Sequence, residues 1–319
     1  MVQFERLGIL LRPETDAQAV FNAGMIREGN TVHMLYRYCE KRGIWHGKTI
    51  DRKKVHSGHG EFPYVKNCIR YARLKTDGTL ACDSKKDVIF PDAPGIVGCE
   101  DPRIVAFEGY YYIFYCTYDN IRAKVSIART RDFQSYEKMG VIDNFAHDKD
   151  AFIFPERFNG KIALMHRIDP GIQIDYFDSF ETMLDPENWK DYQSKVSDRT
   201  ILGPKNGFRK VGGGVPPIKT EMGWLLLYHE VDDSRLYHVG AMLLDLKNPE
   251  KIIAHIPYHV LSPETDYEIS GDYNGCVFPQ GYYMDGDDIV ICYGAGDRYT
   301  ALAKANLQML LDELNEYRL

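Results

Sequence analysis

The chain has 319 residues, 44% hydrophobic and 27% charged, with a formal net charge of −7. This composition is typical of a globular protein with a sizeable core, and the acidic balance argues against a general nucleic-acid binder. No stretch approaches the roughly 18 apolar residues that span a bilayer, and residues 1–13 lack the apolar run of a secretory signal. We therefore expect a cytoplasmic protein with no membrane or nucleic-acid partner.

The cysteines and histidines show no metal-binding or disulfide pattern. The seven cysteines are odd in number and include no Cys-x-x-Cys pair, so reduced thiols that pack in the core are expected. The ten histidines include no HExxH motif, and no aspartate cluster has the spacing of an EF-hand loop. We expect no metal and no organic cofactor.

A unit of strand, glycine turn and strand recurs five times along the chain. The first strands are expected at 23–26, 104–107, 152–154, 215–218 and 276–278, and the second at 31–36, 110–115, 161–166, 224–229 and 288–293. The turns contain Gly29, Gly109, Gly160, Gly223 and Gly286. Five copies leave about 64 residues each, enough for a four-stranded blade. The pattern predicts an all-β, five-bladed β-propeller, with an irregular β-sandwich as the alternative.

One segment has helical rather than strand periodicity. Leucines in 301–317 recur near helical spacing with charges between them, which predicts a short C-terminal helix. This helix is expected to pack on the outside of the propeller or on another subunit, so a homo-oligomer is compatible with the sequence. No linker or change of composition divides the chain, and residues 1–319 are expected to form a single catalytic domain.

Polar side chains recur at the ends of the repeated units that would meet around the axis of a propeller. They are Asn22, Arg37, Glu100, Asp101, Arg103, Lys149, Asp150, His166, Arg167, Lys210, Tyr228, His229, Glu230 and Asp297. Each has a structural reading when taken alone; Asp101, for example, precedes Pro102 as a turn-capping residue often does. Charges that converge in a buried place are costly unless they pair or bind something, so the set predicts a polar ligand. Without a GxSxG elbow or a nucleophilic cysteine motif, acid–base chemistry by carboxylates remains, and glycoside cleavage commonly uses it.

Seven strings along the chain, at 98–105, 149–155, 165–167, 210–220, 223–229, 240–246 and 293–297, carry a resemblance. In these strings and their order the sequence resembles glycoside hydrolase family 130, the mannoside phosphorylases and related β-mannosidases. The resemblance covers essentially the whole chain and implies the five-bladed propeller that the repeats predict independently.

The resemblance also implies a reaction and roles for individual residues. Asp101 matches the catalytic acid, which protonates the glycosidic oxygen through the 3-hydroxyl of the bound mannose while phosphate attacks from the opposite face. The β-mannoside is thereby inverted to α-mannose 1-phosphate, with inorganic phosphate as co-substrate. Lys149, Arg167, Lys210 and His229 match phosphate-binding positions, and Asn22, Arg37 and Asp297 match sugar-binding positions. From their places at the strand ends we add Glu100, His166 and Tyr228 as substrate contacts.

Two residues depart from the pattern of the family's phosphorylases. Lys149 stands where arginine also occurs, and Glu230 stands where glycine is common. Glu230 or Glu268 would serve as base for water in an inverting exo-β-mannosidase, the first alternative; a non-catalytic sugar-binding propeller is the second. The retained cations favour phosphorolysis, because a phosphorylase needs cations to hold its anionic nucleophile. Linkage and acceptor stay open, and segments 40–65 and 170–205 are expected to select the acceptor.

Overall fold

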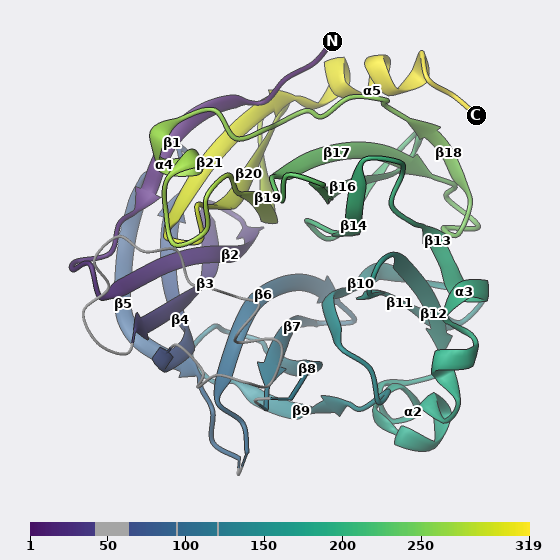
Figure 1. Ribbon diagram of the computed structural model, residues 1–319, viewed down its shortest axis with the longest axis horizontal. Helices are drawn as coiled ribbons and strands as arrows, with labels where there is room; N and C mark the ends of the chain where they lie inside the picture. The colour runs from purple at the N-terminus through teal and green to yellow at the C-terminus, as the bar shows by residue number, and fades with distance from the viewer. Residues whose placement is uncertain (42–63, 94, 120) are drawn as a thin grey trace.

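The computed structural model of the protein describes residues 1–41, 64–93, 95–119 and 121–319. Its strands form five antiparallel sheets that surround a central axis like the blades of a propeller (Figure 1). The predicted all-β, five-bladed fold is confirmed. Most of the predicted acceptor-selecting segment 40–65 lies outside the described residues.

Each blade runs from an innermost strand near the axis to an outer edge. Blade 1 contains β2 (Gln18–Glu28), β3 (Thr31–Lys41), β4 (Tyr64–Lys75) and β5 (Leu80–Ile89). Blade 2 contains β6 (Gly98–Phe107), β7 (Tyr110–Tyr118), β8 (Ala123–Thr130) and β9 (Glu137–Ile142). Blade 3 contains β10 (Asp148–Phe158), β11 (Lys161–Ile168), β12 (Ile172–Phe177) and β13 (Thr200–Leu202). Blade 4 contains β14 (Phe208–Gly213), β16 (Gly223–Asp232), β17 (Tyr237–Leu244) and β18 (Ile252–His255), and β15 (Ile218–Thr220) also pairs with β16.

Blade 5 joins the two ends of the chain. It contains β19 (Val277–Asp285), β20 (Asp288–Ala295) and β21 (Tyr299–Asn306), and its outermost strand is β1 (Glu5–Leu11). Strand β1 pairs with β21 from Glu5 opposite Lys304 to Leu11 opposite Thr300. The purple N-terminal strand therefore lies beside the yellow C-terminal one in Figure 1, and this pairing closes the ring.

In the part of the chain that the structure describes, the helices are short and lie at the outer edge of the ring. Four of these, α2 (Phe180–Leu184), η1 (Pro186–Trp189), η2 (Tyr192–Ser194) and α3 (Val196–Arg199), connect β12 to β13. The others are α4 (Asp266–Ile269) before β19 and α5 (Leu307–Asn315) after β21. No helix in the described residues is long and apolar enough to cross a membrane.

Four of the predicted glycine turns are confirmed, at Gly29, Gly109, Gly160 and Gly286, whereas Gly223 is the first residue of strand β16 and the turn before it lies at 221–222. Two of the confirmed turns show why glycine is needed. Gly109 and Gly160 both have φ of 81°, and the preceding Glu108 and Asn159 have φ of 46° and 50°. Two successive positive φ angles are the signature of a type I′ turn, whose twist matches that of the joined strands. The sequence signal was therefore a direct consequence of hairpin geometry.

Two predicted segments were wrong in their bounds. Residues 301–306 belong to strand β21, and the helix begins only at Leu307. Strand β21 has buried apolar residues on both faces, in two core clusters, so it lacks strand-like alternation. Residues 215–217 are not in a strand either, because Pro216 and Pro217 have no N–H to donate to a ladder.

The hydrophobic core lies between neighbouring blades. One cluster of buried side chains joins blades 2, 3 and 4, and includes Phe152, Trp189 and Trp224. A second joins blades 4 and 5 and takes in Leu310 and Leu314 of α5, which packs on the outside of the ring as predicted. All seven cysteines have free thiols, and all but Cys82 are buried, as the sequence suggested.

Candidate active site

The innermost strands all contain an irregularity in their pairing. The register shifts lie between Phe21 and Ala23, Glu100 and Arg103, Lys149 and Phe152, Phe208 and Lys210, and Pro279 and Gly281. In blades 1, 2 and 3 the shift contains a residue with a left-handed backbone: Asn22, Asp101 and Asp150, with φ of 50°, 58° and 54°. A bulge re-aims a side chain, and such strain gathers at functional sites. Here it directs three polar side chains to the axis.

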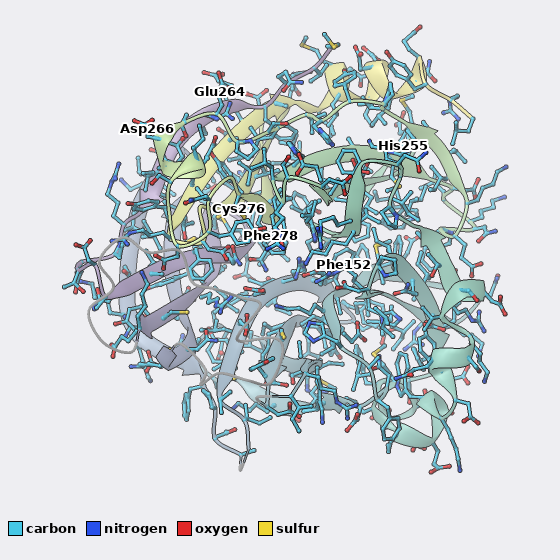
Figure 2. All side chains as sticks on the ribbon, viewed as in Figure 1. Phe152, His255, Glu264, Asp266, Cys276 and Phe278 are labelled. Atoms are coloured by element: carbon cyan, nitrogen blue, oxygen red, sulfur yellow. The ribbon has the colours of Figure 1, made fainter. Side chains whose placement is uncertain are left out.

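These side chains line a cavity at the centre of the ring together with groups from all five blades. Its lining is Asn22, Arg37, Asp101, His147, Lys149, Asp150, Arg167, Lys210, His229, Tyr237, Cys276, Phe278 and Asp297. Figure 2 shows Cys276 and Phe278 pointing to the centre of the ring from the start of blade 5. Eight of the residues given a role from the sequence are therefore brought together here, and Glu100 contacts two of them from the side.

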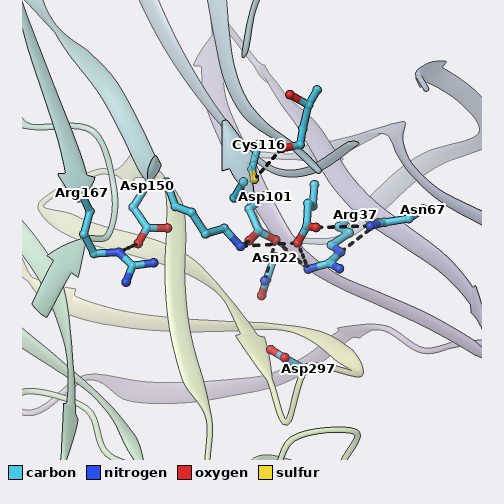
Figure 3. A network of polar contacts seen from close by, with 12 residues as sticks. Asn22, Arg37, Asn67, Asp101, Cys116, Asp150, Arg167 and Asp297 are labelled. Atoms are coloured by element: carbon cyan, nitrogen blue, oxygen red, sulfur yellow. Dashed lines mark hydrogen bonds and ion pairs between the residues drawn. The ribbon is translucent and has the colours of Figure 1, made fainter. Parts of the chain in front are cut away.

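Asp101 is buried in a network of donors (Figure 3). Asn22 Nδ2 donates to Asp101 Oδ1 at 2.9 Å, and Arg37 Nη1 lies 3.2 Å from the same oxygen. Lys149 Nζ lies 3.4 Å from Asp101 Oδ2. Arg37 is itself held by Glu100 Oε2 at 2.7 Å, and so keeps a close partner besides Asp101.

The protonation state of Asp101 follows from these neighbours. Burial acts to raise its pKa, but the charges of Lys149 and Arg37 and the hydrogen bond from Asn22 outweigh burial and lower the pKa to about 2. In the ligand-free site Asp101 is therefore a carboxylate. A role as acid requires that a bound ligand change this balance.

Asp150 forms a second, tighter network with two arginines. Arg167 Nε donates to Asp150 Oδ2 at 2.6 Å, and Arg103 Nη2 donates to Asp150 Oδ1 at 3.2 Å. Arg103 is 1% exposed and crosses to blade 4, where it donates to the carbonyl oxygens of Gly213 and Gly214. Burial opposes ionisation of Asp150, yet the two guanidinium groups hold its pKa well below the usual range. Asp150 is thus a fixed anion that orients Arg167.

His229 and Lys210 face the Asp150 side of the cavity. Neither ring nitrogen of the fully buried His229 makes a hydrogen bond, although Nε2 lies 3.6 Å from Asp150 Oδ2. Burial lowers the pKa of His229 to about 3, so the ring is neutral. Burial and the charge of Arg167 lower the pKa of Lys210 to about 7. A buried imidazole without a hydrogen bond, beside Arg167 and Lys210, provides a donor and two cations for an anion.

Gly212, the first of three successive glycines at the end of β14, shows why a glycine is needed here. A Cβ at this position would lie 2.5 Å from His229 Cε1, 2.6 Å from Arg167 Cδ and 2.7 Å from Asp150 Oδ2. The backbone of β14 therefore passes in contact with the anion-binding groups, and any side chain would displace them. The glycine run is part of the site rather than a kinked loop.

Two residues selected from the sequence lie elsewhere. His166 is enclosed by Asp148 at 2.9 Å and Asp175 at 3.1 Å; burial lowers its pKa, but these carboxylates dominate and raise it to about 10. Tyr228 packs between blades 3 and 4, and its hydroxyl lies 2.6 Å from His255 Nε2, at the outer edge of the ring in Figure 2. Neither lines the cavity, because successive strand residues point to opposite faces and Arg167 and His229 take the inward positions.

Both candidate bases are held by other partners. Glu230 lies 3.0 Å from Lys205 Nζ and 2.9 Å from His259 Nε2. Glu268 is fully buried, accepts from Arg6 Nε at 2.9 Å and from the hydroxyl of Tyr293 at 2.8 Å, and caps helix α4. Figure 2 places its neighbours Glu264 and Asp266 at the periphery. Neither carboxylate lines the cavity, so neither is placed to activate water there.

Some residues of the site were given no role from the sequence. Arg103 and Asp150 were among the polar residues expected at the ends of the units, but their pairing joins two blades and has no local signal, so no function was assigned to them. His147, Tyr237 and Phe278 come from strand ends and a loop whose direction only the fold reveals. No group of three or more His, Cys, Asp or Glu side chains in the described residues is arranged to hold a metal ion.

Comparisons with known proteins agree with this geometry. The Glyco_hydro_130 family model, described as beta-1,4-mannooligosaccharide phosphorylase, matches residues 9–316. The chain is 33% identical over 305 residues to the 1,2-beta-oligomannan phosphorylase of Thermoanaerobacter sp. (strain X514), covering 93% of this chain and 92% of the relative. It is also 33% identical to the beta-1,2-mannobiose phosphorylase of the same strain, covering 91% of each.

A solved structure has the same fold. The beta-1,2-mannobiose phosphorylase from Listeria innocua, in complex with beta-1,2-mannobiose, superposes with a TM-score of 0.80 over 98% of this chain and 99% of that one, at 24% identity. The match of the family model over nearly the whole chain, and the identity to these relatives, carry the assignment. The chain belongs to glycoside hydrolase family 130.

Proposed function

We propose that this enzyme cleaves a β-mannoside with phosphate, with inversion, to give α-D-mannose 1-phosphate and a shortened saccharide. The observation that carries the proposal is the convergence of Lys149, Arg167, Lys210 and His229, whose ring makes no hydrogen bond, on the cavity that also contains Asp101. Hydrolysis by water needs no anion-binding groups, whereas phosphorolysis depends on them to hold the nucleophile against the sugar. The positions of Glu230 and Glu268, away from the cavity, further favour phosphorolysis.

The ligand-free geometry suggests how phosphate would prepare the acid. Lys149 Nζ lies 3.4 Å from Asp101 and 3.6 Å from Glu100, so it holds two carboxylates when no phosphate is bound. A phosphate dianion would attract Lys149 and add negative charge near Asp101. Both changes raise the pKa of Asp101 and allow it to take up a proton.

The proposed reaction then follows in one displacement. Asp101 gives its proton, by way of the 3-hydroxyl of the bound mannose, to the glycosidic oxygen as the bond from C1 to that oxygen breaks. A phosphate oxygen held by Arg167, Lys210 and His229 forms the new bond to C1 from the opposite face. The shortened saccharide leaves with a free hydroxyl, and Asp101 returns to the carboxylate that the ligand-free site stabilises.

The relatives suggest the linkage and the setting. Those with 33% identity and coverage above 90% are named for β-1,2-linked substrates, so we propose a β-1,2-linked manno-oligosaccharide.

Since every blade contributes to the cavity, we propose that residues 1–319 act as one catalytic domain. The free thiols suit a reducing compartment, and we propose the cytoplasm. Inorganic phosphate is the co-substrate, and the proposed steps call for no further cofactor.

Product analysis tests this proposal. The enzyme and its Asp101→Asn variant are incubated with β-1,2- or β-1,4-mannobiose, each with and without phosphate. We expect α-mannose 1-phosphate only with phosphate, only from the unsubstituted enzyme and mainly from the β-1,2 disaccharide. Free mannose in the absence of phosphate would instead show a hydrolase. Binding of the disaccharide without any cleavage would show a sugar-binding protein.

A further inference from the structure

Phe145 lies near the cavity along the chain and has an unusual backbone conformation. It is in the loop between β9 and β10, two residues before His147, which lines the cavity. Two residues of chain span at most about 7 Å, so the Cα of Phe145 lies within about 7 Å of the Cα of His147. Its side chain is 54% exposed.

The backbone of Phe145 is left-handed, with φ of 62°. For a bulky side chain this is a genuine outlier that needs an explanation. Phe133 has a similar φ of 55°, but it is 3% exposed and stacks on His33 with ring centroids 4.1 Å apart. Packing inside the protein therefore accounts for Phe133. It does not account for Phe145, whose exposed ring has the Arg122 guanidinium 5.7 Å from its centroid.

The loop is nevertheless held firmly in this shape. Asp143 Oδ1 accepts from the Phe145 amide at 3.2 Å and from Arg122 Nη2 at 2.8 Å. Gln193, from the segment predicted to select the acceptor, donates its Nε2 to the Phe145 carbonyl at 2.9 Å. Asn144 Nδ2 donates to Asp148 Oδ2 at 2.6 Å at the start of β10. The fold thus fixes an exposed aromatic ring in advance, as a binding platform requires.

We propose that Phe145 is a stacking platform for a sugar of the leaving saccharide, beyond the sugar adjacent to the cleaved bond. The inference rests on the proposed function for the identity of this saccharide. A pyranose ring presents an apolar face of C–H groups that can stack on an aromatic ring. Its hydroxyls would form hydrogen bonds with the neighbouring Arg122 and Asp143. Because Phe145 lies outside the cavity that His147 lines, the sugar it contacts is not the first leaving sugar. Phe145 would then set the preference for longer substrates.

The test compares β-1,2-mannotriose with β-1,2-mannobiose, first by calorimetric binding without phosphate and then by kcat/KM for phosphorolysis. For each enzyme we take the ratio of the trisaccharide value to the disaccharide value, once for the association constant and once for kcat/KM. Phe145→Ala is expected to lower both ratios about tenfold, and Phe145→Trp to keep them within about twofold. Phe90→Ala is the matched control. Phe90 is 46% exposed, directly follows the last strand of blade 1, and has Lys138 of β9 over its ring. This substitution should leave both ratios unchanged. Phe145→Gly should lower both ratios without lowering Tm, because glycine adopts this φ freely.

The outcomes separate the inference from the proposed function. An unchanged binding ratio in Phe145→Ala overturns the platform. A lower molar mass of Phe145→Ala in light scattering, with the ratio unchanged, would assign the ring to a subunit contact and also overturn it. If the unsubstituted enzyme forms no mannose 1-phosphate but the binding ratio falls in the variant, the platform stands and the proposed reaction fails.

Discussion

Asp101 in blade 2 and Asp150 in blade 3 occupy matching places on neighbouring innermost strands, each in a bulge and each with a left-handed backbone. Their partners differ. Asp150 is held by two arginines at 2.6 and 3.2 Å, of which Arg167 also pairs with Asp169, whereas the cations nearest Asp101, Lys149 and Arg37, share Glu100 as their second partner. The same backbone device therefore holds one permanent anion and one carboxylate that a ligand can release. The comparison shows that partners, rather than local geometry, decide which carboxylate can exchange a proton.

The largest expected effect comes from removing the exchangeable carboxylate. Asp101→Asn should lower kcat/KM for phosphorolysis by at least about 10³-fold, at the upper part of the range for loss of a general acid. The loss of stability should be small, because Arg37 and Lys149 keep Glu100 as a partner. Formation of mannose 1-phosphate and urea denaturation measure the two effects. Substantial residual activity would mean that another group donates the proton.

Removing the fixed carboxylate should show the opposite profile. Asp150→Asn leaves the buried Arg103 without its carboxylate partner and leaves Arg167 with Asp169 alone, so we expect about 3 kcal/mol lower free energy of unfolding. Urea denaturation of this variant and of Asp101→Asn, compared side by side, checks the difference. Equal stability losses in the two variants would contradict the distinction drawn here.

A methyl group at Gly212 tests how closely the anion-binding groups are packed. Gly212→Ala would press on His229, Arg167 and Asp150 at 2.5 to 2.7 Å, and we expect about a tenfold rise in KM for phosphate. The affinity for the sugar in the absence of phosphate should change less. Gly160→Ala, at a turn far from the site with open space around the glycine, controls for loss of stability.

The charge of Lys210 should make phosphate binding depend on pH. Its pKa is depressed to about 7, so the lysine is charged below pH 7 and becomes neutral as the pH rises through 7. KM for phosphate is therefore expected to rise several-fold between pH 6 and 8, roughly one pH unit on either side of that pKa. Lys210→Arg keeps its charge over this range and should flatten the profile. An unchanged profile in the variant would exclude Lys210 as the titrating group.

The smallest effect is expected at Glu230. Because it pairs with Lys205 and His259 outside the cavity, Glu230→Gln should change phosphorolysis less than about threefold. Kinetics at saturating phosphate measure this. A loss of activity as large as that of Asp101→Asn would show that Glu230 takes part in catalysis and would favour the hydrolytic mechanism.

Much of this architecture was visible in the sequence, for physical reasons. Gly109 and Gly160 marked their turns because the turns need positive φ angles, and the apolar runs marked strands because blades bury them. Segment 301–306 misled because both of its faces are buried: Ala301, Ala303 and Ala305 pack in one core cluster and Leu302 in another, so the strand lacks clear alternation and resembles a helix. No local pattern distinguishes those two states.

The site was predicted less completely than the fold. His166 and Tyr228 were selected with their neighbours Arg167 and His229, although alternation along a strand allows only one of each pair to face the axis. That signal was available and would have excluded two residues. The left-handed bulges at Asn22 and Asp101 depend on contacts between blades, which single-sequence patterns do not contain.

The pairing of β1 with β21 also has a consequence for biosynthesis. Residues 5–11 are synthesised nearly 300 residues before the strand that pairs with them, β21, which ends at Asn306. Arg6, which forms an ion pair with the buried Glu268, is on this first strand. Strand β1 therefore has no partner in blade 5 until β21 has been synthesised, and the ring closes only afterwards.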